Sequence, residues 1–265
     1  MSPGFRHLLL AGAVSLLLQA CAAKDEAPYV ERPVGELYNS AVNQLESENF
    51  NEAARQFEEV ERQHPYSQWA TKAKIMAAYS YYQANKYDDA IIALDRFIQL
   101  HPAHPDTPYA YYLKGLSYYE QISDVTRDQK MTEQALSMFT DLMRRFPDST
   151  YARDARLKTD LARDHLAGKE MEIGRTYQRP GHYLAAINRF RAVVDNHQTT
   201  THVPEALHRM VESYLALGVT EEARRIAAVL GHNFPGDAWY GESYALLEGR
   251  IGQPPAKSDP WYKIW

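Results

Sequence analysis

The sequence predicts an all-α superhelical solenoid built from about five helical hairpins. One pattern recurs along the chain: an alanine, apolar residues four and seven positions later, and then a proline that ends the segment. The alanines are spaced by 37, 45, 51 and 37 residues, so a basal period of 37 carries insertions in two intervals. Such a period is typical of stacked helical hairpins. A small residue twelve positions before several of the alanines indicates a closely packed partner helix.

The recurring pattern defines the second helix of each hairpin. Spacings of four and three residues place the apolar side chains on one stripe of a helix, and proline cannot continue that helix. One copy, Ala186-Phe190-Val193, ends at Gln198 in place of proline. The complete copies are Ala53-Phe57-Val60-Pro65, Ala90-Leu94-Phe97-Pro102, Ala135-Phe139-Leu142-Pro147 and Ala223-Ala227-Leu230-Pro235.

The first helix of each hairpin is predicted upstream of the second. A small residue at its centre lets the two helices approach closely, and in repeat three this residue is displaced upstream by an insertion. The small residues are Ala41, Ala78, Gly115 and Gly174. Together, the Gly-x2-Tyr, Ala-x3-Phe and Pro landmarks resemble the tetratricopeptide-repeat family. An ordinary helical bundle with coincidental alanines is the alternative.

A long helix is predicted over residues 148–178, because apolar residues recur there at helical spacing without a proline. It would join two halves of the solenoid. The first half is formed by amino-terminal repeats one to three, residues 35–147, and the second by the linking helix and repeats four and five, residues 148–235. Residues 236–265 are expected to form a carboxy-terminal helix and an aromatic tail.

The amino terminus, residues 1–20, has the features of a signal peptide. Its apolar run from Leu8 to Leu18 is too short to span a bilayer and ends in Leu-Gln-Ala-Cys. This ending resembles the bacterial lipobox, which implies cleavage before Cys21 and lipidation of that residue; a buried or incidental cysteine is the alternative. Alanine at the next position implies sorting to the outer membrane. Residues 21–34 would then tether the anchor to the first repeat.

Charge and motif content exclude several function classes. The net charge is −5, and the excess of acidic residues lies in residues 21–62, so no basic tract predicts nucleic-acid binding. The ten histidines are scattered without a metal-binding spacing, and the single cysteine excludes disulfides within the chain. We find no nucleophile, phosphate-loop or dinucleotide motif. The sequence therefore predicts a binding protein without enzymatic activity, metal or cofactor.

Tyrosine is unusually frequent, with 19 tyrosines against 8 phenylalanines. Tetratricopeptide folds line their concave groove with defined positions of each first helix. Applying that register predicts an aromatic groove in the first half, formed by Tyr38, Tyr79, Tyr82, Tyr109, Tyr112 and Tyr119. In the second half it predicts a polar groove, formed by Met171, Arg175, Gln178, Glu205, His208 and Glu212. Tyrosine suits capture of extended peptides, although packing between repeats is the alternative role.

A more specific resemblance lies between repeats two and three, in the segment Leu94-Asp95-Arg96-Phe97-Ile98-Gln99-Leu100-His101-Pro102-Ala103-His104-Pro105. Matching stretches surround it at Tyr79-Ser80-Tyr81-Tyr82, Phe146-Pro147-Asp148-Ser149-Thr150-Tyr151 and Ala185-Ala186-Ile187-Asn188-Arg189. With the lipobox, they resemble the BamD family, the outer-membrane lipoproteins of the β-barrel assembly machinery. The resemblance covers about residues 18–235.

This resemblance implies a location at the periplasmic face of the outer membrane, with the lipid anchor in the membrane. It implies that the first half binds unfolded outer-membrane proteins through their carboxy-terminal targeting strand. It further implies that the second half, with Arg189 and Arg225 among its exposed charges, docks on a periplasmic POTRA domain of BamA and on smaller lipoproteins of the machinery. A tetratricopeptide lipoprotein of pilus or secretin assembly is the alternative. A peptidoglycan-linked enzyme is a second alternative, but it would need catalytic residues that we do not find.

Two segments depart from the family pattern. The insertion at residues 123–130 is shorter than in many relatives and lacks an expected proline, where Gln129 stands. The aromatic tail, residues 253–265, has no counterpart; we expect it to cover the last repeat, or else to compete for the peptide groove. The substrate selectivity, the stoichiometry and the energy source of assembly do not follow from the sequence.

Overall fold

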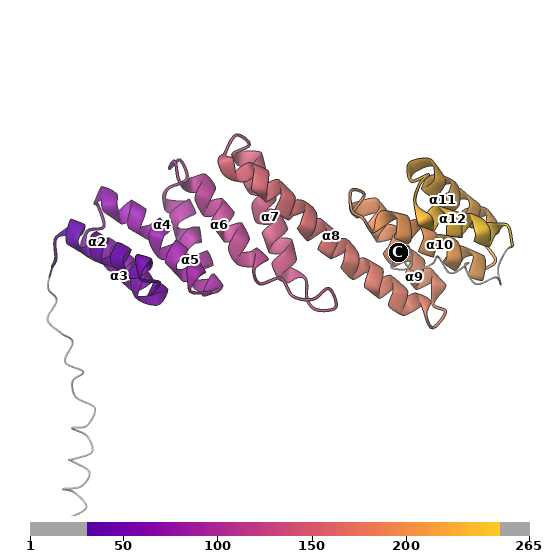
Figure 1. Ribbon diagram of the computed structural model, residues 1–265, viewed down its shortest axis with the longest axis horizontal. Coiled ribbons are helices and arrows are strands. Elements are labelled where there is room, and N and C mark those ends of the chain that lie inside the picture. The colour runs from indigo at the N-terminus through magenta and orange to yellow at the C-terminus, as the bar shows by residue number, and fades with distance from the viewer. Residues whose placement is uncertain (1–30, 250–265) are drawn as a thin grey trace, which may run out of the picture.

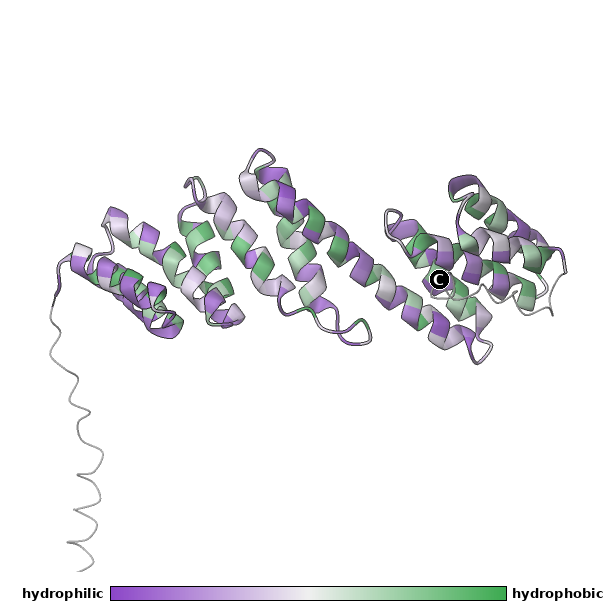
Figure 2. Ribbon diagram, viewed as in Figure 1, coloured by the Kyte–Doolittle hydropathy of each residue, from purple (hydrophilic) through white to green (hydrophobic). Residues whose placement is uncertain are grey.

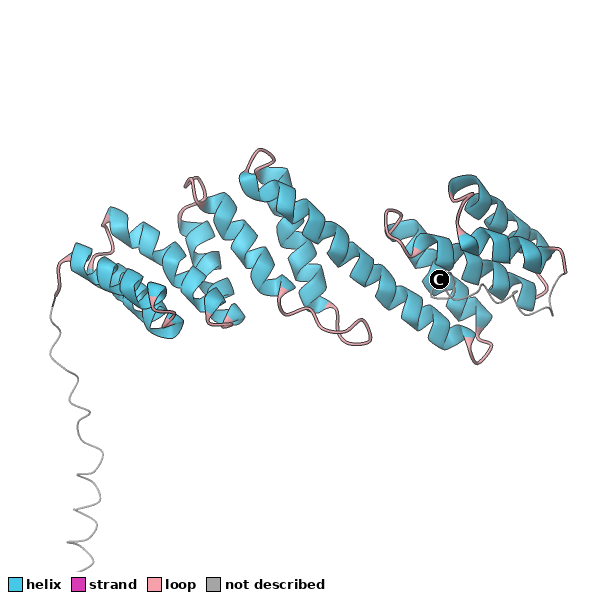
Figure 3. Ribbon diagram, in the orientation of Figure 1, coloured by secondary structure: helices cyan, strands magenta, loops and turns pink. Residues whose placement is uncertain are grey.

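A computed structural model describes residues 31–249. This part of the chain consists of helices and connecting loops (Figure 3). Its eleven helices are α2 (Val34–Glu46), α3 (Phe50–Gln63), α4 (Gln68–Gln83), α5 (Tyr87–Leu100), α6 (Thr107–Tyr119), α7 (Lys130–Arg145), α8 (Thr150–Gln178), α9 (Tyr183–Asn196), α10 (Val203–Ala216), α11 (Thr220–Asn233) and α12 (Ala238–Leu247). The predicted signal peptide, the predicted lipidation site Cys21 and the tail at 253–265 lie outside the described residues.

The helices stack in chain order into an elongated solenoid (Figure 1). Each helix packs on the next, and the first helices of neighbouring hairpins also touch: α2 contacts α4, α4 contacts α6, and α6 contacts α8. These first helices therefore share one side of the solenoid, which we call the inner side. The predicted all-α tetratricopeptide-type fold is confirmed.

The recurring apolar residues form the core. In all five second helices, α3, α5, α7, α9 and α11, the alanine and the two apolar residues of the pattern are buried. The largest of these side chains, Phe57, Phe97, Phe139 and Phe190, are fully buried. Burying a phenylalanine side chain stabilises a fold by about 1.5–3 kcal/mol, so one ring in each of the first four hairpins is a substantial contribution.

Glycines in the first helices let these rings approach the backbone. An ideal Cβ at Gly115 would lie 2.5 Å from Cε1 of Phe139, and one at Gly174 would lie 2.4 Å from Cε1 of Phe190. The predicted close approach of the two helices is confirmed here. A glycine also packs against an aromatic ring at the carboxy-terminal end of the described chain, where Gly231 of α11 faces the ring of Tyr240 in α12.

The predicted long helix is confirmed as α8, Thr150–Gln178. Its amino-terminal part packs on α7 and its carboxy-terminal part on α9, so one helix belongs to both halves of the solenoid (Figure 1). Apolar and polar residues are mixed along every helix (Figure 2). Within residues 31–249, none of the helices combines the length and the apolar character needed to cross a membrane.

Candidate peptide-binding and docking surfaces

Tyrosine side chains gather on the inner side of the first half. Tyr79 and Tyr82 project from α4, while Tyr109, Tyr112 and Tyr119 project from α6, and all five are partly buried. The structure adds a sixth side chain, Tyr151 at the start of α8. Its ring lies 5.2 Å from that of Tyr112 in a stacked arrangement and 5.3 Å from that of Tyr109. We call these six residues the tyrosine surface.

Sequence reasoning missed Tyr151. The groove positions of repeat four are counted from Gly174, near the carboxy-terminal end of α8, and this register does not reach the start of the helix. The first two turns of the same helix, however, pack beside α6. The sequence carries a signal for this residue, because Tyr151 lies both in the predicted long helix and in one of the stretches that resemble the BamD family.

Two of the tyrosine hydroxyl groups, those of Tyr82 and Tyr112, form hydrogen bonds with acidic side chains. The Tyr112 hydroxyl donates to Oδ2 of Asp154 at 2.5 Å, and the Tyr82 hydroxyl lies 3.4 Å from Oε1 of Glu120. Burial, assisted by Glu120, raises the pKa of Tyr82 to about 12, and burial followed by the hydrogen bond to Asp154 raises the pKa of Tyr112. These phenols therefore stay neutral at physiological pH, so the surface offers rings with hydrogen-bonding tips.

Tyr38 differs from the other predicted groove residues. It is only 6% exposed, and its ring packs 5.4 Å from that of Phe57 and 4.7 Å from that of Trp69. Its place in the groove is therefore corrected to a packing role in the first hairpin. The reason is that Phe57 of α3 and Trp69 of α4, the first helix of the next hairpin, both pack against the Tyr38 ring.

The insertion between α6 and α7 is attached to the long helix. Nε2 of His165 in α8 lies 2.9 Å from the carbonyl oxygen of Ser123. Nζ of Lys169, also in α8, donates to the carbonyl oxygen of Thr126 at 2.8 Å. Val125 of the insertion approaches Gly168 of α8. The insertion therefore braces the middle of α8, at the border between the two halves.

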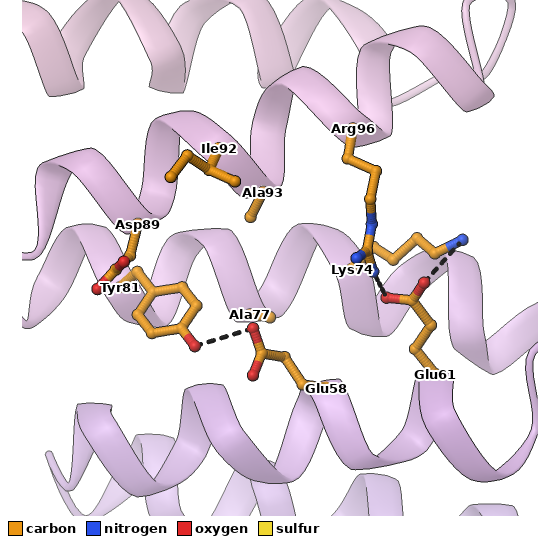
Figure 4. Close-up of a pocket in the computed structure, with 9 residues that line it drawn as sticks. All are labelled: Glu58, Glu61, Lys74, Ala77, Tyr81, Asp89, Ile92, Ala93 and Arg96. Carbon is orange, nitrogen blue, oxygen red and sulfur yellow. Dashed lines mark hydrogen bonds and ion pairs between the residues drawn. The ribbon is translucent and has the colours of Figure 1, made fainter.

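A small pocket lies among α3, α4 and α5, with a volume of about 130 Å³ (Figure 4). At one end the Tyr81 hydroxyl donates to Oε1 of Glu58 at 2.8 Å, and at the other end Glu61 pairs with both Lys74 and Arg96. Burial, and then the bond to Glu58, raises the pKa of Tyr81. These interactions tie the first two hairpins together, which gives them a structural role.

The second half carries a polar cluster across α8, α10 and α12. Arg175 pairs with Glu205 at 2.8 Å, and Arg209 pairs with Glu212 at 2.9 Å. Burial alone would raise the pKa of Glu212, but hydrogen bonds from His208 and Arg209 outweigh it and lower the pKa to about 2. The predicted polar character is thus present, with two exceptions. Met171 is a fully buried core residue, and His208 is only 2% exposed.

The two predicted docking arginines are exposed and paired within their own half. Nη1 of Arg189 in α9 lies 3.2 Å from Oε2 of Glu170, and Arg225 in α11 pairs with Glu222. The structure adds an apolar patch close to Arg189, which sequence reasoning missed. An open pocket of about 460 Å³ is lined by Tyr177, Gly181, His182, Tyr183, Leu184, Ala185 and Leu217. Leu184 is 68% exposed, and no periodicity marks it because it lies on the outward side of α9.

Across residues 31–249, no three or more histidine, cysteine, aspartate or glutamate side chains are grouped so that they could hold a metal ion. The pockets that open among these residues are shallow surfaces between helices, lined by paired charges or by tyrosine and aliphatic side chains. Such surfaces suit a macromolecular partner better than an enclosed small molecule.

Comparison with known proteins identifies the family to which this chain is related. A family model described as YfiO, outer membrane lipoprotein, matches residues 30–229. The outer membrane protein assembly factor BamD of Caulobacter vibrioides is 53% identical over 237 residues, which cover 88% of this chain and 78% of the relative. That of Rickettsia prowazekii is 45% identical over 235 residues, covering 89% and 94%. Among solved structures, the TPR domain of P58(IPK) aligns with a TM-score of 0.43 and 15% identity over 81% of this chain and 56% of that one. The chain therefore belongs to the BamD family of outer membrane lipoproteins.

Proposed function

We propose that this protein binds unfolded outer-membrane proteins and scaffolds BamA during their insertion, anchored by Cys21 at the periplasmic face of the outer membrane. The observation that carries the proposal is the tyrosine surface on α4, α6 and α8. Its six rings follow one side of three consecutive first helices, and the hydroxyl groups of Tyr82 and Tyr112 are hydrogen-bonded to acidic side chains.

The chemistry of this surface matches an extended peptide. The targeting strand of a barrel protein alternates apolar and polar side chains and ends in an aromatic residue. One face of such a strand can pack on tyrosine rings, while the phenol groups bond with its backbone or polar side chains. Tyrosine loses little conformational entropy on binding, since its ring turns about only two torsions.

Removing two rings tests the proposal. Tyr82 and Tyr112 project from neighbouring helices, and each is only partly buried. Truncating an anchor aromatic typically costs about 2 kcal/mol. We therefore expect Tyr82→Ala with Tyr112→Ala to weaken binding of a carboxy-terminal barrel peptide at least about tenfold, measured by fluorescence anisotropy. The conservative pair Tyr82→Phe with Tyr112→Phe should retain most of the affinity if the rings carry it.

Tyr66 provides the matched control. It is fully exposed in the loop between α3 and α4, so Tyr66→Ala should leave peptide affinity unchanged. Circular dichroism has to show that the double alanine variant stays folded, because both rings also touch the cores around α5 and α7. Unchanged affinity in the folded double variant would return these tyrosines to a packing role and remove the main support for the proposal.

We place the docking of BamA, through a POTRA domain, and of smaller lipoproteins on the second half. Arg189 offers a charge beside the apolar patch formed by Tyr177, Leu184 and Leu217. An apolar centre with a charged rim is the usual anatomy of a protein interface. Arg225 lies on α11, the corresponding second helix of the next hairpin, and would contribute charge at the rim.

A further inference from the structure

The turn between α3 and α4 presents two aromatic side chains to solvent. The backbone N–H of Ser67 donates to the carbonyl oxygen of His64 at 3.0 Å, and Pro65 stands at the second position of this turn, which proline favours. Tyr66 follows at the tip and is fully exposed. Trp69, in the first turn of α4, is 42% exposed, and its backbone N–H donates to the Ser67 hydroxyl group at 3.1 Å. Both rings are therefore held by an ordered backbone.

The segment around these rings lacks charged side chains. Residues 63–71 contain no aspartate, glutamate, lysine or arginine. A single exposed apolar residue is common on a protein surface and needs no explanation. A tyrosine and a tryptophan exposed together on an uncharged turn are different, because both rings combine an apolar body with a polar tip and favour the boundary between water and lipid.

The chain enters the fold at this same turn. The backbone N–H of Arg32 donates to Oε1 of Gln63 at 2.9 Å, and Nε2 of His64 lies 2.7 Å from the carbonyl oxygen of Arg32. Cys21, the predicted lipidation site, precedes Arg32 by eleven residues, which span at most about 40 Å even when fully extended. An anchor at Cys21 therefore keeps the turn near the membrane surface, where a weak contact forms at a high effective concentration.

The turn also lies on a defined edge of the solenoid. The first helices α2, α4 and α6 lie side by side, so the loops that precede them share one edge and the turns within the hairpins share the opposite edge (Figure 1). Helix α4 has 16 residues, so Lys86, in the turn between α4 and α5, lies about 24 Å from the α3–α4 turn. The edge at which the chain enters is thus the edge that carries the aromatic pair.

We propose that the α3–α4 turn rests on the phospholipid headgroup region of the membrane that holds the anchor, with the rings of Tyr66 and Trp69 at the boundary between water and acyl chains. The anchor limits the distance to the membrane, and the turn sets the orientation of the first hairpin, since a single attachment point leaves the solenoid free to rotate. The inference rests on the anchor at Cys21 in the proposed function. It uses no residue of the tyrosine surface.

A fluorescent probe beside the aromatic pair tests the inference on the full lipidated chain in vesicles of phosphatidylethanolamine and phosphatidylglycerol. Cys21 is the only cysteine of the chain, and its sulfur carries lipid in the anchored protein, so an introduced cysteine is the single free thiol. Gln68→Cys places the probe at an exposed position between the two rings, and Lys86→Cys places it at an exposed position on the opposite edge. We expect spin-labelled phospholipid to quench the probe at position 68 at least about threefold more than the probe at position 86, because one length of α4 separates them.

Substitutions at the turn assign this effect to the rings. Tyr66→Ser with Trp69→Gln, made in the Gln68→Cys chain, should lower the quenching to the level of the Lys86→Cys chain. Circular dichroism checks this variant, because Trp69 also packs on the Tyr38 ring. Tyr66→Ser alone changes a fully exposed side chain, so it should reduce the quenching without lowering the melting temperature. Tyr66→Trp should retain the quenching, because tryptophan also favours the membrane interface.

The possible results separate this inference from the proposed function. If the two probes are quenched equally, or if Tyr66→Ser with Trp69→Gln leaves the quenching unchanged, the membrane contact is refuted while the anchor and peptide binding stand. If the probe at position 68 responds only when BamA is present in the same vesicles, a protein covers the turn and the membrane contact is again refuted. If mass spectrometry shows Cys21 without lipid, both the proposed anchor and this inference are refuted.

Discussion

At the scale of single residues, the fold depends on what faces each buried phenylalanine. Gly115 and Gly174 have no side chain, and the rings of Phe139 and Phe190 occupy the space that a Cβ would need. Both rings are fully buried among neighbours that leave little room to move. The glycine and the ring therefore act as one unit, and changing either one disturbs the contact between two helices.

Gly174→Ala should lower the free energy of unfolding. The added Cβ would lie 2.4 Å from Cε1 of Phe190, so the ring or the helix must shift, and overpacking of this kind costs about 1–3 kcal/mol. The control is Gly241→Ala in α12, where no atom lies within 4 Å of the new Cβ. That substitution should be neutral or stabilise by up to about 1 kcal/mol. Urea denaturation measures both, and equal midpoints for the two variants would contradict the close contact.

At the scale of helices, α8 holds the two halves together through contacts on both of its sides. The insertion braces its middle through His165 and Lys169, and the polar cluster ties its last turns to α10. That cluster depends on ionised carboxylates. Glu212 is partly buried beside His208 and Arg209, and the pKa of its carboxyl group is lowered to about 2.

The cluster predicts a loss of stability in acid. Because the pKa of Glu212 is lower in the folded chain than the usual value of about 4.3, its contribution is present above that value and is lost as the pH falls toward 2. Glu212→Gln should therefore lower the free energy of unfolding at pH 7 by about 2 kcal/mol and reduce its further decrease between pH 6 and pH 3. Denaturation at several pH values measures this.

Glu221→Gln is the control for this experiment, because Glu221 pairs with Arg224 on the exposed surface of α11, where an ion pair contributes little. If Glu212→Gln and the wild-type protein lost stability in parallel as the pH fell, Glu212 would have no part in the acid sensitivity.

At the scale of the whole molecule, the two halves present different chemistry along one solenoid. The first half offers a row of tyrosines on its inner side, and the second half offers paired charges with an apolar patch beside α9. The halves share α8, so the proposed binding of an unfolded client to the first half and of a partner to the second would be compatible with each other.

Leu184→Glu should separate these two activities. A charge placed in the apolar patch has to be desolvated on docking, so we expect at least about tenfold less BamA to co-purify from outer-membrane extracts. Affinity for the barrel peptide should stay unchanged. The control is Leu157→Glu, which alters a leucine of similar exposure, 62%, on the first part of α8. Recovery of a pilus secretin in place of BamA would favour the alternative function.

The sequence by itself determined the architecture of residues 31–249 because a solenoid is made of local units. Each hairpin is specified by residues within one period, such as Ala186, Phe190 and Gly174, and these contacts repeat along the chain. The stripe of buried residues and the long helix could therefore be predicted without knowing how distant segments meet. The polar character of the groove in the second half followed from the same register.

Only the tertiary structure decided how residues from different repeats combine into surfaces. Tyr38 is covered by Trp69, Tyr151 joins the tyrosines of α6, and Leu184 lies open beside Leu217. Each of these outcomes depends on the angle and offset between neighbouring hairpins, which a helical register does not contain. The physical reason is that burial is a property of the packed stack, whereas periodicity describes one helix at a time.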